Sequence, residues 1–223
     1  MMSSRTLPCF LVVIALAVSS CSESTSSEDE YANWKERNEL FLASVVNDSL
    51  HSPDSQSQWK RIKCFSLDEN TEGTINDYIY VRVVGHASQR DEEVSNASQL
   101  DETGCPAYTD SVRVSYQGRL IPTASYPEGK IFDSTVYGAY NDKTNSSTKF
   151  RVASLTAGFS TALQHMHRGD HWRIYVPAAL GYGESGSGTS IPGYSVIIFE
   201  LTLIDFSPVG EAMPVWSARA QRP

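Results

Sequence analysis

Three histidines that lie close together, His165, His167 and His171, have the spacing that most suggests a metal site in this chain. The spacing of Phe159, Leu163 and Met166 predicts a helix over residues 156–166, which contains His165. Residues two apart on a helix point about 200° away from each other, so His165 and His167 cannot share one ion. We therefore expect no metal site.

A glycine-rich segment and many serines are the other features that could indicate an active site. Residues 181–188, GYGESGSG, resemble a phosphate-binding loop, but they lack the lysine and the following helix that such a loop needs. Serine is plentiful, but no nucleophile-elbow motif accompanies it. Neither phosphate binding nor a serine nucleophile is expected.

The first twenty residues have the order of a secretory signal peptide. One basic residue, Arg5, precedes an apolar run from Cys9 to Val18, and small residues follow. A helix that spans a bilayer needs about 20 apolar residues, so this run is too short. Residues 1–20 are therefore predicted to be a signal peptide, with a buried N-terminal strand as the alternative.

The residues at the expected cleavage site, Val18-Ser19-Ser20-Cys21, resemble a bacterial lipobox, whose cysteine becomes the new N-terminus and takes up diacylglycerol. Several acyl chains on Cys21 hold a protein at a membrane far more firmly than one chain does. Residues 21–30 are polar and acidic and predict a flexible tether. We expect a lipid-anchored protein of the bacterial cell envelope, at the outer membrane, with the periplasmic and surface faces both open. An ordinary signal cleaved nearby is the alternative.

The chain is acidic, with a formal net charge of −8. Removal of residues 1–20 takes away Arg5 and no acidic residue, so the charge goes from −8 to −9. Binding to nucleic acid needs a basic face, and we therefore expect no nucleic-acid partner.

Two cysteines, Cys64 and Cys105, remain after Cys9 leaves with the signal peptide and Cys21 is acylated. In an oxidising compartment, two such cysteines predict one disulfide. It would close a loop of about forty residues and stabilise the fold by a few kcal/mol. Two free thiols are the alternative, because the sequence carries no information on the distance between them.

The elements that position a site begin with a helix over residues 31–46, which Asn47-Asp48-Ser49 is expected to end. Trp34, Phe41 and Val45 lie near one face of this helix. A helix of this length is marginal alone and should dock on its own domain or on a partner chain. Two strands and a long polar surface loop are then predicted: 59–65, 78–84 and 85–104.

The second half of the chain alternates between apolar and polar residues, which is typical of half-buried strands. Residues 111–117, SVRVSYQ, alternate in this way, with Arg113 and Ser115 on the polar face. A strand at 172–176 alternates in the same way, and residues 196–206 are apolar on both faces, which suits a central strand; both follow the helix at 156–166. Strands interrupted by one helix predict an antiparallel α+β fold, and 223 residues suffice for one principal domain.

Four separated segments resemble, in order and nearly in spacing, the FKBP family of peptidyl-prolyl cis-trans isomerases: VSYQGRL at 114–120, GKIFDST at 129–135, LTAGFSTALQHMHRGD at 155–170, and residues 176–206. The resemblance covers about residues 110–206. It implies an FKBP-like antiparallel twisted sheet wrapped around one short helix. We expect an N-terminal extension at 31–104, an isomerase domain at 105–206 and a flexible tail at 207–223.

The resemblance also implies the residues of a proline-binding pocket. The catalytic residues would be Asp133, Tyr182 and Phe132, and the substrate-binding residues Tyr116, Leu155, Thr156, Phe159, Ile191 and Phe199. Two positions depart from the family: Phe159 stands where tryptophan is usual, and Thr156 where an aliphatic residue is usual. Phe150 lies near the position of a further wall aromatic, but the differing loop before it leaves this position unassigned.

The expected chemistry is rotation about an X-Pro amide, which is slow because the barrier is about 20 kcal/mol. An apolar pocket removes water from the amide, and this costs the polar planar form more free energy than the less polar twisted form. Tyr182 and the backbone N–H of Thr156 can donate hydrogen bonds to a substrate carbonyl. Asp133 either orders the pocket or acts on the amide electrostatically. No cofactor is needed.

These inferences predict an isomerase that assists the folding of exported proteins in the bacterial envelope and binds proline-containing unfolded or extended polypeptides. The N-terminal helix would be a spacer, a substrate-gripping arm or the contact of a homodimer. One alternative function is a catalytically weak or inactive FKBP-like chaperone or protein-binding module. Another is a surface lipoprotein that uses the same fold as a scaffold to recruit a different ligand.

Overall fold

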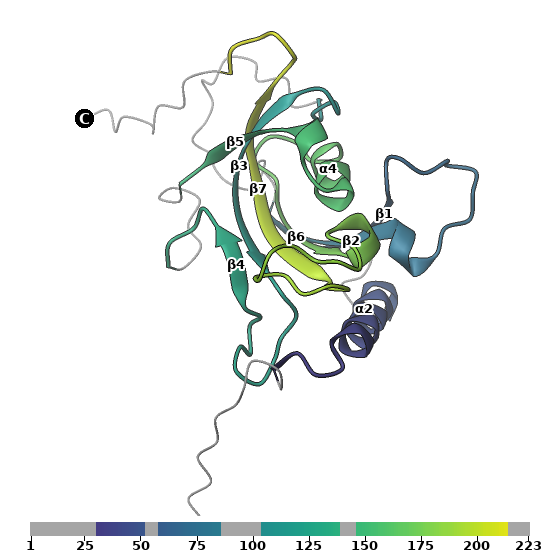
Figure 1. Cartoon of the computed structure of the whole chain (residues 1–223). Coiled ribbons are helices and arrows are strands. Elements are labelled where there is room, and N and C mark those ends of the chain that lie inside the picture. Colours follow the sequence, from purple (N-terminus) through teal and green to yellow (C-terminus); the bar gives the residue numbers. More distant parts are fainter. Residues whose placement is uncertain (1–29, 52–57, 86–103, 139–145, 214–223) are drawn as a thin grey trace, which may run out of the picture.

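The computed structural model describes residues 30–51, 58–85, 104–138 and 146–213 (Figure 1). The predicted signal peptide, the predicted anchor at Cys21 and most of the predicted tether lie outside these residues, as do nearly all of the predicted loop at 85–104 and the end of the predicted tail. Among the described residues, no helix combines the length and hydropathy needed to cross a membrane.

A seven-stranded sheet forms the body of the protein, and each strand pairing in the described residues is antiparallel. The strand order is β1-β2-β6-β7-β3-β4, and β5 also pairs with β3. The strands are β1 Trp59–Lys63, β2 Tyr78–Gly85, β3 Ser111–Arg119, β4 Ile131–Ser134, β5 Thr148–Arg151, β6 His171–Val176 and β7 Ile197–Ser207. The expected α+β class, an antiparallel sheet around one short helix, is confirmed.

The expectation that the strand at 111–117 is half-buried is wrong. Arg113 and Ser115, assigned to its polar face, are only 7% and 2% exposed. The segment that follows β4 lies against this strand, where Thr135 Oγ1 is 3.3 Å from Ser115 Oγ and accepts a hydrogen bond from the backbone N–H of Tyr116. The segment after β4 therefore covers Ser115.

The short helix α4, Ala157–Leu163, lies in the curve of the sheet (Figure 1). It is shorter than expected because its end tightens: the N–H of His165 bonds Ala162 O at 3.0 Å, three residues back instead of four. Gly158 lets the helix approach the sheet closely, since a Cβ there would lie 2.4 Å from Val176 Cγ1. The helix is thereby held against β6 at the start of the predicted pocket.

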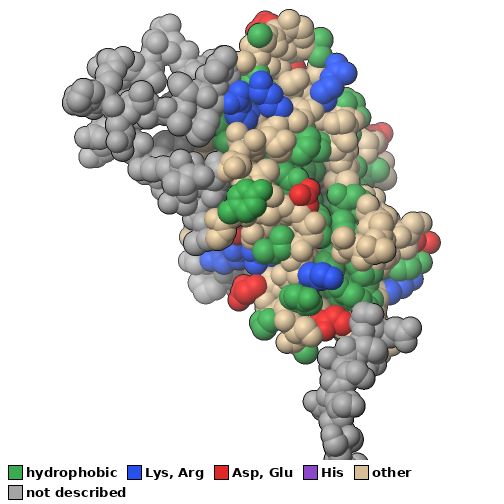
Figure 2. Space-filling model, turned by 60° about the vertical axis from the view of Figure 1, so that its left-hand side comes forward, with side chains coloured by type: hydrophobic (Ala, Val, Ile, Leu, Met, Phe, Trp, Pro, Cys, Tyr) green, Lys and Arg blue, Asp and Glu red, His purple; other side chains and the backbone are tan. Residues whose placement is uncertain are grey.

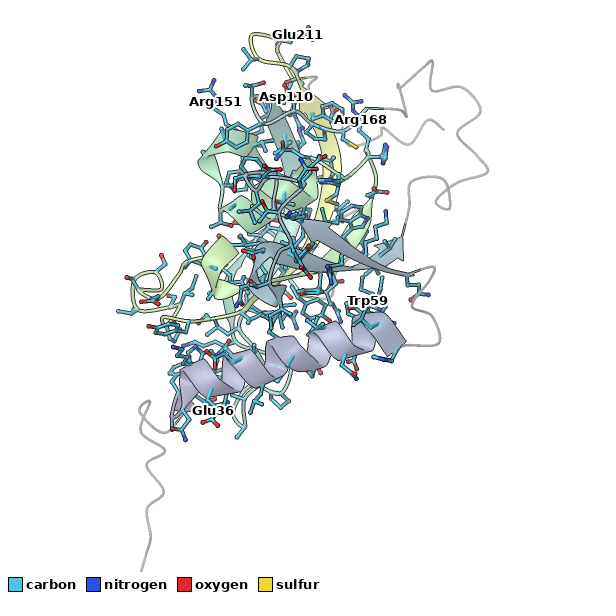
Figure 3. All side chains as sticks on the ribbon, turned by 90° about the vertical axis from the view of Figure 1, so that its right-hand side faces the viewer. Glu36, Trp59, Asp110, Arg151, Arg168 and Glu211 are labelled. Carbon is cyan, nitrogen blue, oxygen red and sulfur yellow. The ribbon has the colours of Figure 1, made fainter. Side chains whose placement is uncertain are left out.

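The N-terminal helix α2, Trp34–His51, is longer than predicted, since it continues through Asn47-Asp48-Ser49. Its buried residues are Trp34, Asn38, Leu42 and Val45, whose spacing of four, four and three follows one helix face. In Figure 3, α2 runs along one side of the sheet, with Glu36 in its first turn and Trp59 of β1 beside its other end. Docking on its own domain explains why a helix of marginal intrinsic stability forms.

The two helices pack on opposite faces of the strands β1, β2 and β6. A Cβ on Gly158 of α4 would meet Ile79 and Val176, whereas Phe41 of α2 contacts Tyr175, with ring centroids 6.2 Å apart. Neighbouring residues of a strand point to opposite faces, so Val176 and Tyr175 face different helices. Because β2 pairs with β6, the sheet also crosses the boundary predicted at residue 104.

The disulfide expected between Cys64 and Cys105 is absent, and both thiols are free. Cys64 is 2% exposed and its Sγ lies 3.7 Å from Thr161 Oγ1 on α4. The Sγ of Cys105 instead lies 3.7 Å from Nε2 of His167. The two cysteines have separate neighbours, so the alternative of two free thiols holds.

A partly buried carboxylate on β7 links stability to pH. Glu200 pairs across the strands with Arg173, whose guanidinium lies 3.0 Å from Oε2, and Nε2 of His171 lies 3.2 Å from Oε1. The hydrogen bonds from His171 and then Arg173 lower the pKa of Glu200 to about 2, although burial opposes the shift. The charged form of Glu200 is therefore stabilised by folding.

We expect the free energy of unfolding to fall as the pH falls from about 4.5, the ordinary pKa of Glu200, to about 2. A carboxylate whose pKa is lower in the folded state stabilises the fold fully at a pH above its unfolded-state pKa. This contribution is lost as the pH falls through its folded-state pKa. The loss amounts to at most about 3 kcal/mol. Urea unfolding at pH 5, 4, 3 and 2 measures it. Over this pH range, the free energy of unfolding of Glu200→Gln should fall less than that of the wild type. The exposed control Glu128→Gln should lose as much as the wild type. Equal losses in both variants would contradict the role of Glu200.

Candidate functional site

Aromatic rings from five separate parts of the chain meet at one end of α4. Phe159 of α4 and Phe199 of β7 have ring centroids 4.8 Å apart at an interplanar angle of 81°. Phe132 of β4 lies 5.9 Å from Phe199, and Tyr116 of β3 lies 5.9 Å from Phe159. Tyr182, just after the 3-10 helix η4 Ala178–Leu180, lies 6.5 Å from Phe132. These edge-to-face contacts make one aromatic cluster.

The cluster has a buried floor and a partly exposed rim. Tyr116, Phe159 and Phe199 are 7%, 4% and 4% exposed, whereas Phe132 and Tyr182 are half-buried. In Figure 2 the side of the molecule that carries β4 and β5 faces the viewer, and hydrophobic side chains lie across the middle of this face among scattered charged ones. A ligand that reaches the rim would meet the apolar surface of these rings.

A tyrosine and a carboxylate connect the cluster to its polar edge. The hydroxyl of Tyr116 donates a hydrogen bond to Oδ2 of Asp133, which is an exposed residue of β4. Burial, followed by this hydrogen bond, raises the pKa of Tyr116 well above its usual value. Burial and then the charge of Asp133 raise the pKa of Tyr182 as well. Both hydroxyls therefore stay protonated and able to donate at neutral pH.

The remaining predicted residues surround the same core. Leu155 precedes α4 and packs against the core cluster, and Thr156 is the N-cap of α4, with its carbonyl accepting from Ser160 N at 2.9 Å. Ile191, 5% exposed, is part of the same core and pairs with Ser187 in an isolated bridge. The structure thus brings the predicted aromatic residues and Asp133 together directly, and places Leu155, Thr156 and Ile191 on adjoining segments.

Two residues near the cluster were not assigned from the sequence. Phe150 of β5 lies 5.9 Å from Tyr116, so it adjoins the cluster on the side of β5. Gly118 of β3 pairs with both Phe199 and Asp133, and a Cβ there would lie 2.5 Å from Phe132 Cζ and 2.8 Å from Phe199 Cε1. A glycine in the middle of a strand was the available signal, since it often marks a close approach of another group.

The three histidines have different partners. Nδ1 of His165 bonds the backbone O of Thr161 at 2.8 Å, His167 lies beside Cys105, and His171 faces Glu200. In the part of the chain that the structure describes, no three His, Cys, Asp or Glu side chains are grouped so that they could hold a metal ion.

The family comparison matches residues 103–204 to the family described as FKBP-type peptidyl-prolyl cis-trans isomerase. The FKBP-type 22 kDa peptidyl-prolyl cis-trans isomerase of Escherichia coli K12 is 38% identical over 104 residues, which cover 47% of this chain and 45% of that protein. The outer membrane protein MIP of Legionella longbeachae is 35% identical over 99 residues, which cover 44% of this chain and 37% of that protein. The chain thus matches less than half the length of each of these relatives.

A solved structure of similar fold extends the match toward the N-terminus. The peptidyl-prolyl cis-trans isomerase of Pseudomonas syringae pv. tomato superposes with a TM-score of 0.50 at 23% identity and covers 79% of this chain and 96% of that chain. At 23% identity, this similarity shows that the two proteins share a fold.

Proposed function

We propose that this chain, whose residues 103–204 belong to the FKBP-type peptidyl-prolyl cis-trans isomerase family, is itself a peptidyl-prolyl cis-trans isomerase. The observation that carries the proposal is the aromatic cluster, in which a buried floor meets a rim of Phe132 and Tyr182. The relatives share only part of their length with this chain, so the activity is proposed from the site.

The cluster can lower the barrier to rotation without a covalent step. The planar X-Pro amide is polar because of resonance, and that polarity falls as the bond twists. An apolar floor of Tyr116, Phe159 and Phe199 offers the amide no water, so it disfavours the planar form more than the twisted one. The proline ring would lie on Phe159, which replaces the usual tryptophan with a smaller ring.

Hydrogen-bond donors at the rim would hold the peptide. The hydroxyl of Tyr182, which is protonated at neutral pH, can donate to a substrate carbonyl. The backbone N–H of Thr156 lies at the start of α4, where N–H groups have no partner within the helix. Because Asp133 accepts from Tyr116, we assign Asp133 the role of ordering the pocket.

A proline-limited refolding assay with the full chain in detergent tests the activity. We expect micromolar protein to accelerate refolding of a client whose slow phase is an X-Pro isomerisation. No acceleration would contradict the proposal. Suppression of aggregation without any acceleration would indicate the chaperone alternative instead.

We further propose that the chain works in the bacterial envelope on exported polypeptides and is anchored by lipid at Cys21. The leader and lipobox in the sequence support this, as does the name of the Legionella relative, an outer membrane protein. Labelled palmitate should enter the wild-type chain and not Cys21→Ala. Equal labelling of both would contradict the anchor.

The homodimer through the N-terminal helix stays a prediction. The buried face of α2 is occupied by its own domain, so a second copy would have to use the outer face, where Leu40 and Leu50 are 65% and 59% exposed.

A further inference from the structure

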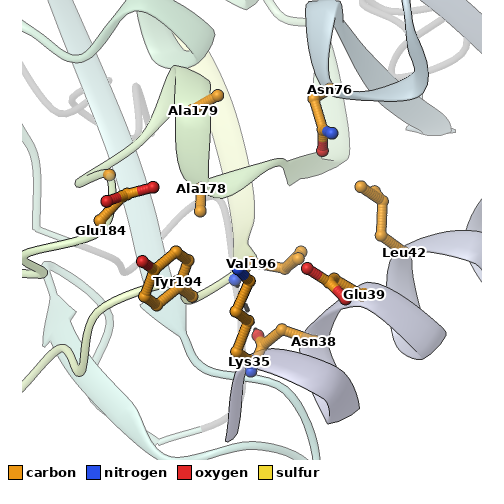
Figure 4. A pocket seen from close by; sticks show the side chains of 11 residues that line it. Lys35, Asn38, Glu39, Leu42, Asn76, Ala178, Ala179, Glu184, Tyr194 and Val196 are labelled. Atoms are coloured by element: carbon orange, nitrogen blue, oxygen red, sulfur yellow. Dashed lines mark hydrogen bonds between the residues drawn. The ribbon is translucent and has the colours of Figure 1, made fainter.

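The helix α2 lies beside the loop that carries two of the predicted pocket residues. This loop, residues 181–196, joins η4 to β7 and contains Tyr182 and Ile191. A hollow of about 270 Å³ lies between the first turns of α2 and this loop, and none of the predicted site residues lines it (Figure 4). The loop is therefore not held by continuous packing against α2.

Two buried side chains of α2, of which Asn38 lines this hollow, reach the end of the loop. The indole Nε1–H of Trp34 donates to Ser195 Oγ at 2.9 Å, and Asn38 Oδ1 accepts from the backbone N–H of Val196 at 2.8 Å. The amide of Asn38 also donates to the carbonyl of Trp34 at 2.7 Å. Asn38 is 1% exposed, and a buried amide is costly unless it is bonded in this way.

An asparagine at position 38 indicates that this residue hydrogen-bonds the loop and does not only fill space in the core. Asn38 occupies the buried stripe that Trp34, Leu42 and Val45 fill with apolar groups, where an apolar side chain could pack without needing partners. Its hydrogen bonds instead fix the residue that directly precedes β7. Phe199, in the floor of the cluster, lies three residues further along the chain.

From Ser195 and Tyr194 the hydrogen bonds continue to Pro192 and Gly183 of the loop. Ser195 Oγ accepts from Trp34 and donates to Pro192 O at 2.6 Å, directly after Ile191. The N–H of Tyr194 donates to Gly183 O at 2.9 Å, directly after Tyr182.

Tyr194 itself is held in an unusual conformation. Its φ of +61° lies in the left-handed region that side chains other than glycine rarely adopt. The ammonium of Lys35 on α2 lies 4.5 Å from the centre of its ring, so α2 contacts this residue too. A strained residue persists only when its surroundings determine it, and here α2 is part of those surroundings.

We propose that α2 positions the proline pocket: Trp34 and Asn38, acting through Ser195 and Val196, hold loop 181–196 so that Tyr182 and Ile191 stay against the aromatic cluster. This inference rests on the proposed isomerase function. Trp34 and Asn38 are positioning residues, because their bonds reach the loop and not the aromatic cluster.

A double-mutant cycle in the full chain tests the connection through Ser195. Trp34→Phe keeps an aromatic ring but removes the N–H donor. Ser195→Ala removes the hydroxyl that accepts from Trp34 and donates to Pro192. Each should lower kcat/KM by roughly three- to tenfold, mainly through a higher KM. The double variant should be no worse than Ser195→Ala alone, because the indole N–H acts only through Ser195.

Val45→Ala is the matched control. Val45 lies on the same face of α2 and is 5% exposed, so its truncation costs stability through packing without touching the loop. Its kcat/KM should equal that of the wild type. A loss equal to that of Trp34→Phe, or losses that multiply in the double variant, would overturn the proposal.

Hydrogen exchange separates this proposal from the proposed activity. In Trp34→Phe and Asn38→Leu, amides of residues 181–196 should exchange faster than in the wild type, while those of β3 stay unchanged. If the wild type proves inactive, the proposed isomerase function fails and exchange still tests the positioning role. Unchanged exchange in both variants would overturn the positioning role whether or not the wild type is active.

Discussion

Phe132→Ala is expected to lower kcat/KM on proline-containing peptides by roughly ten- to hundredfold, which corresponds to losing the apolar contact of one phenyl ring. Phe132 is half-buried on β4 and forms the rim of the aromatic cluster, with its ring 5.9 Å from Phe199 and 6.5 Å from Tyr182. Because β4 is the last strand of the sheet order and the ring is partly exposed, stability should fall by only about 1 kcal/mol.

Ile131→Ala provides the control on the same strand. Ile131 is 49% exposed and does not belong to the hydrophobic core, so its truncation leaves the cluster intact. We expect wild-type kcat/KM for this variant, measured with the same tetrapeptide substrates and with urea unfolding in parallel. If Phe132→Ala keeps the wild-type kcat/KM, the cluster is not the site of reaction.

Gly118→Ala is expected to damage both activity and stability, although it adds a single methyl group. The new Cβ would lie 2.5 Å from Phe132 Cζ and 2.8 Å from Phe199 Cε1, closer than such atoms can approach. Phe199 is 4% exposed and contacts Phe159 at 4.8 Å, so it has little room to move. We expect kcat/KM to fall at least about tenfold and the free energy of unfolding by about 1–3 kcal/mol.

Gly85→Ala is the matched control for the added methyl, because a Cβ at Gly85 meets no atom within 4 Å. Its stability and activity should stay near the wild type. In the Phe132→Ala background, Gly118→Ala should cost less stability than in the wild type, because one of the two clashing rings is gone. Equal costs in both backgrounds would contradict the clash with Phe132.

Patterns among residues that are close together in the sequence were enough to predict most strands, the family of the domain and the aromatic site. Alternating residues predicted β3 and β6, β-rich composition predicted β2, and a run apolar on both faces predicted β7, each nearly at its observed bounds. The joint order of four segments predicted the FKBP-type domain and the aromatic residues that the structure brings together. The lipobox at Cys21 is also a local signal, and it stays a prediction.

The tertiary structure decided what depends on partners distant in the chain. Asn38 looks like a polar interruption of a helix until Val196 supplies its bond, and Gly118 looks dispensable until Phe132 and Phe199 meet over it. Cys64 and Cys105 have separate neighbours, which their spacing in the sequence could not show, and β5 pairs with residues of β3 that lie more than thirty positions earlier in the chain. Periodicity shows which face of an element is apolar, but the group that covers that face is determined by how the whole chain folds.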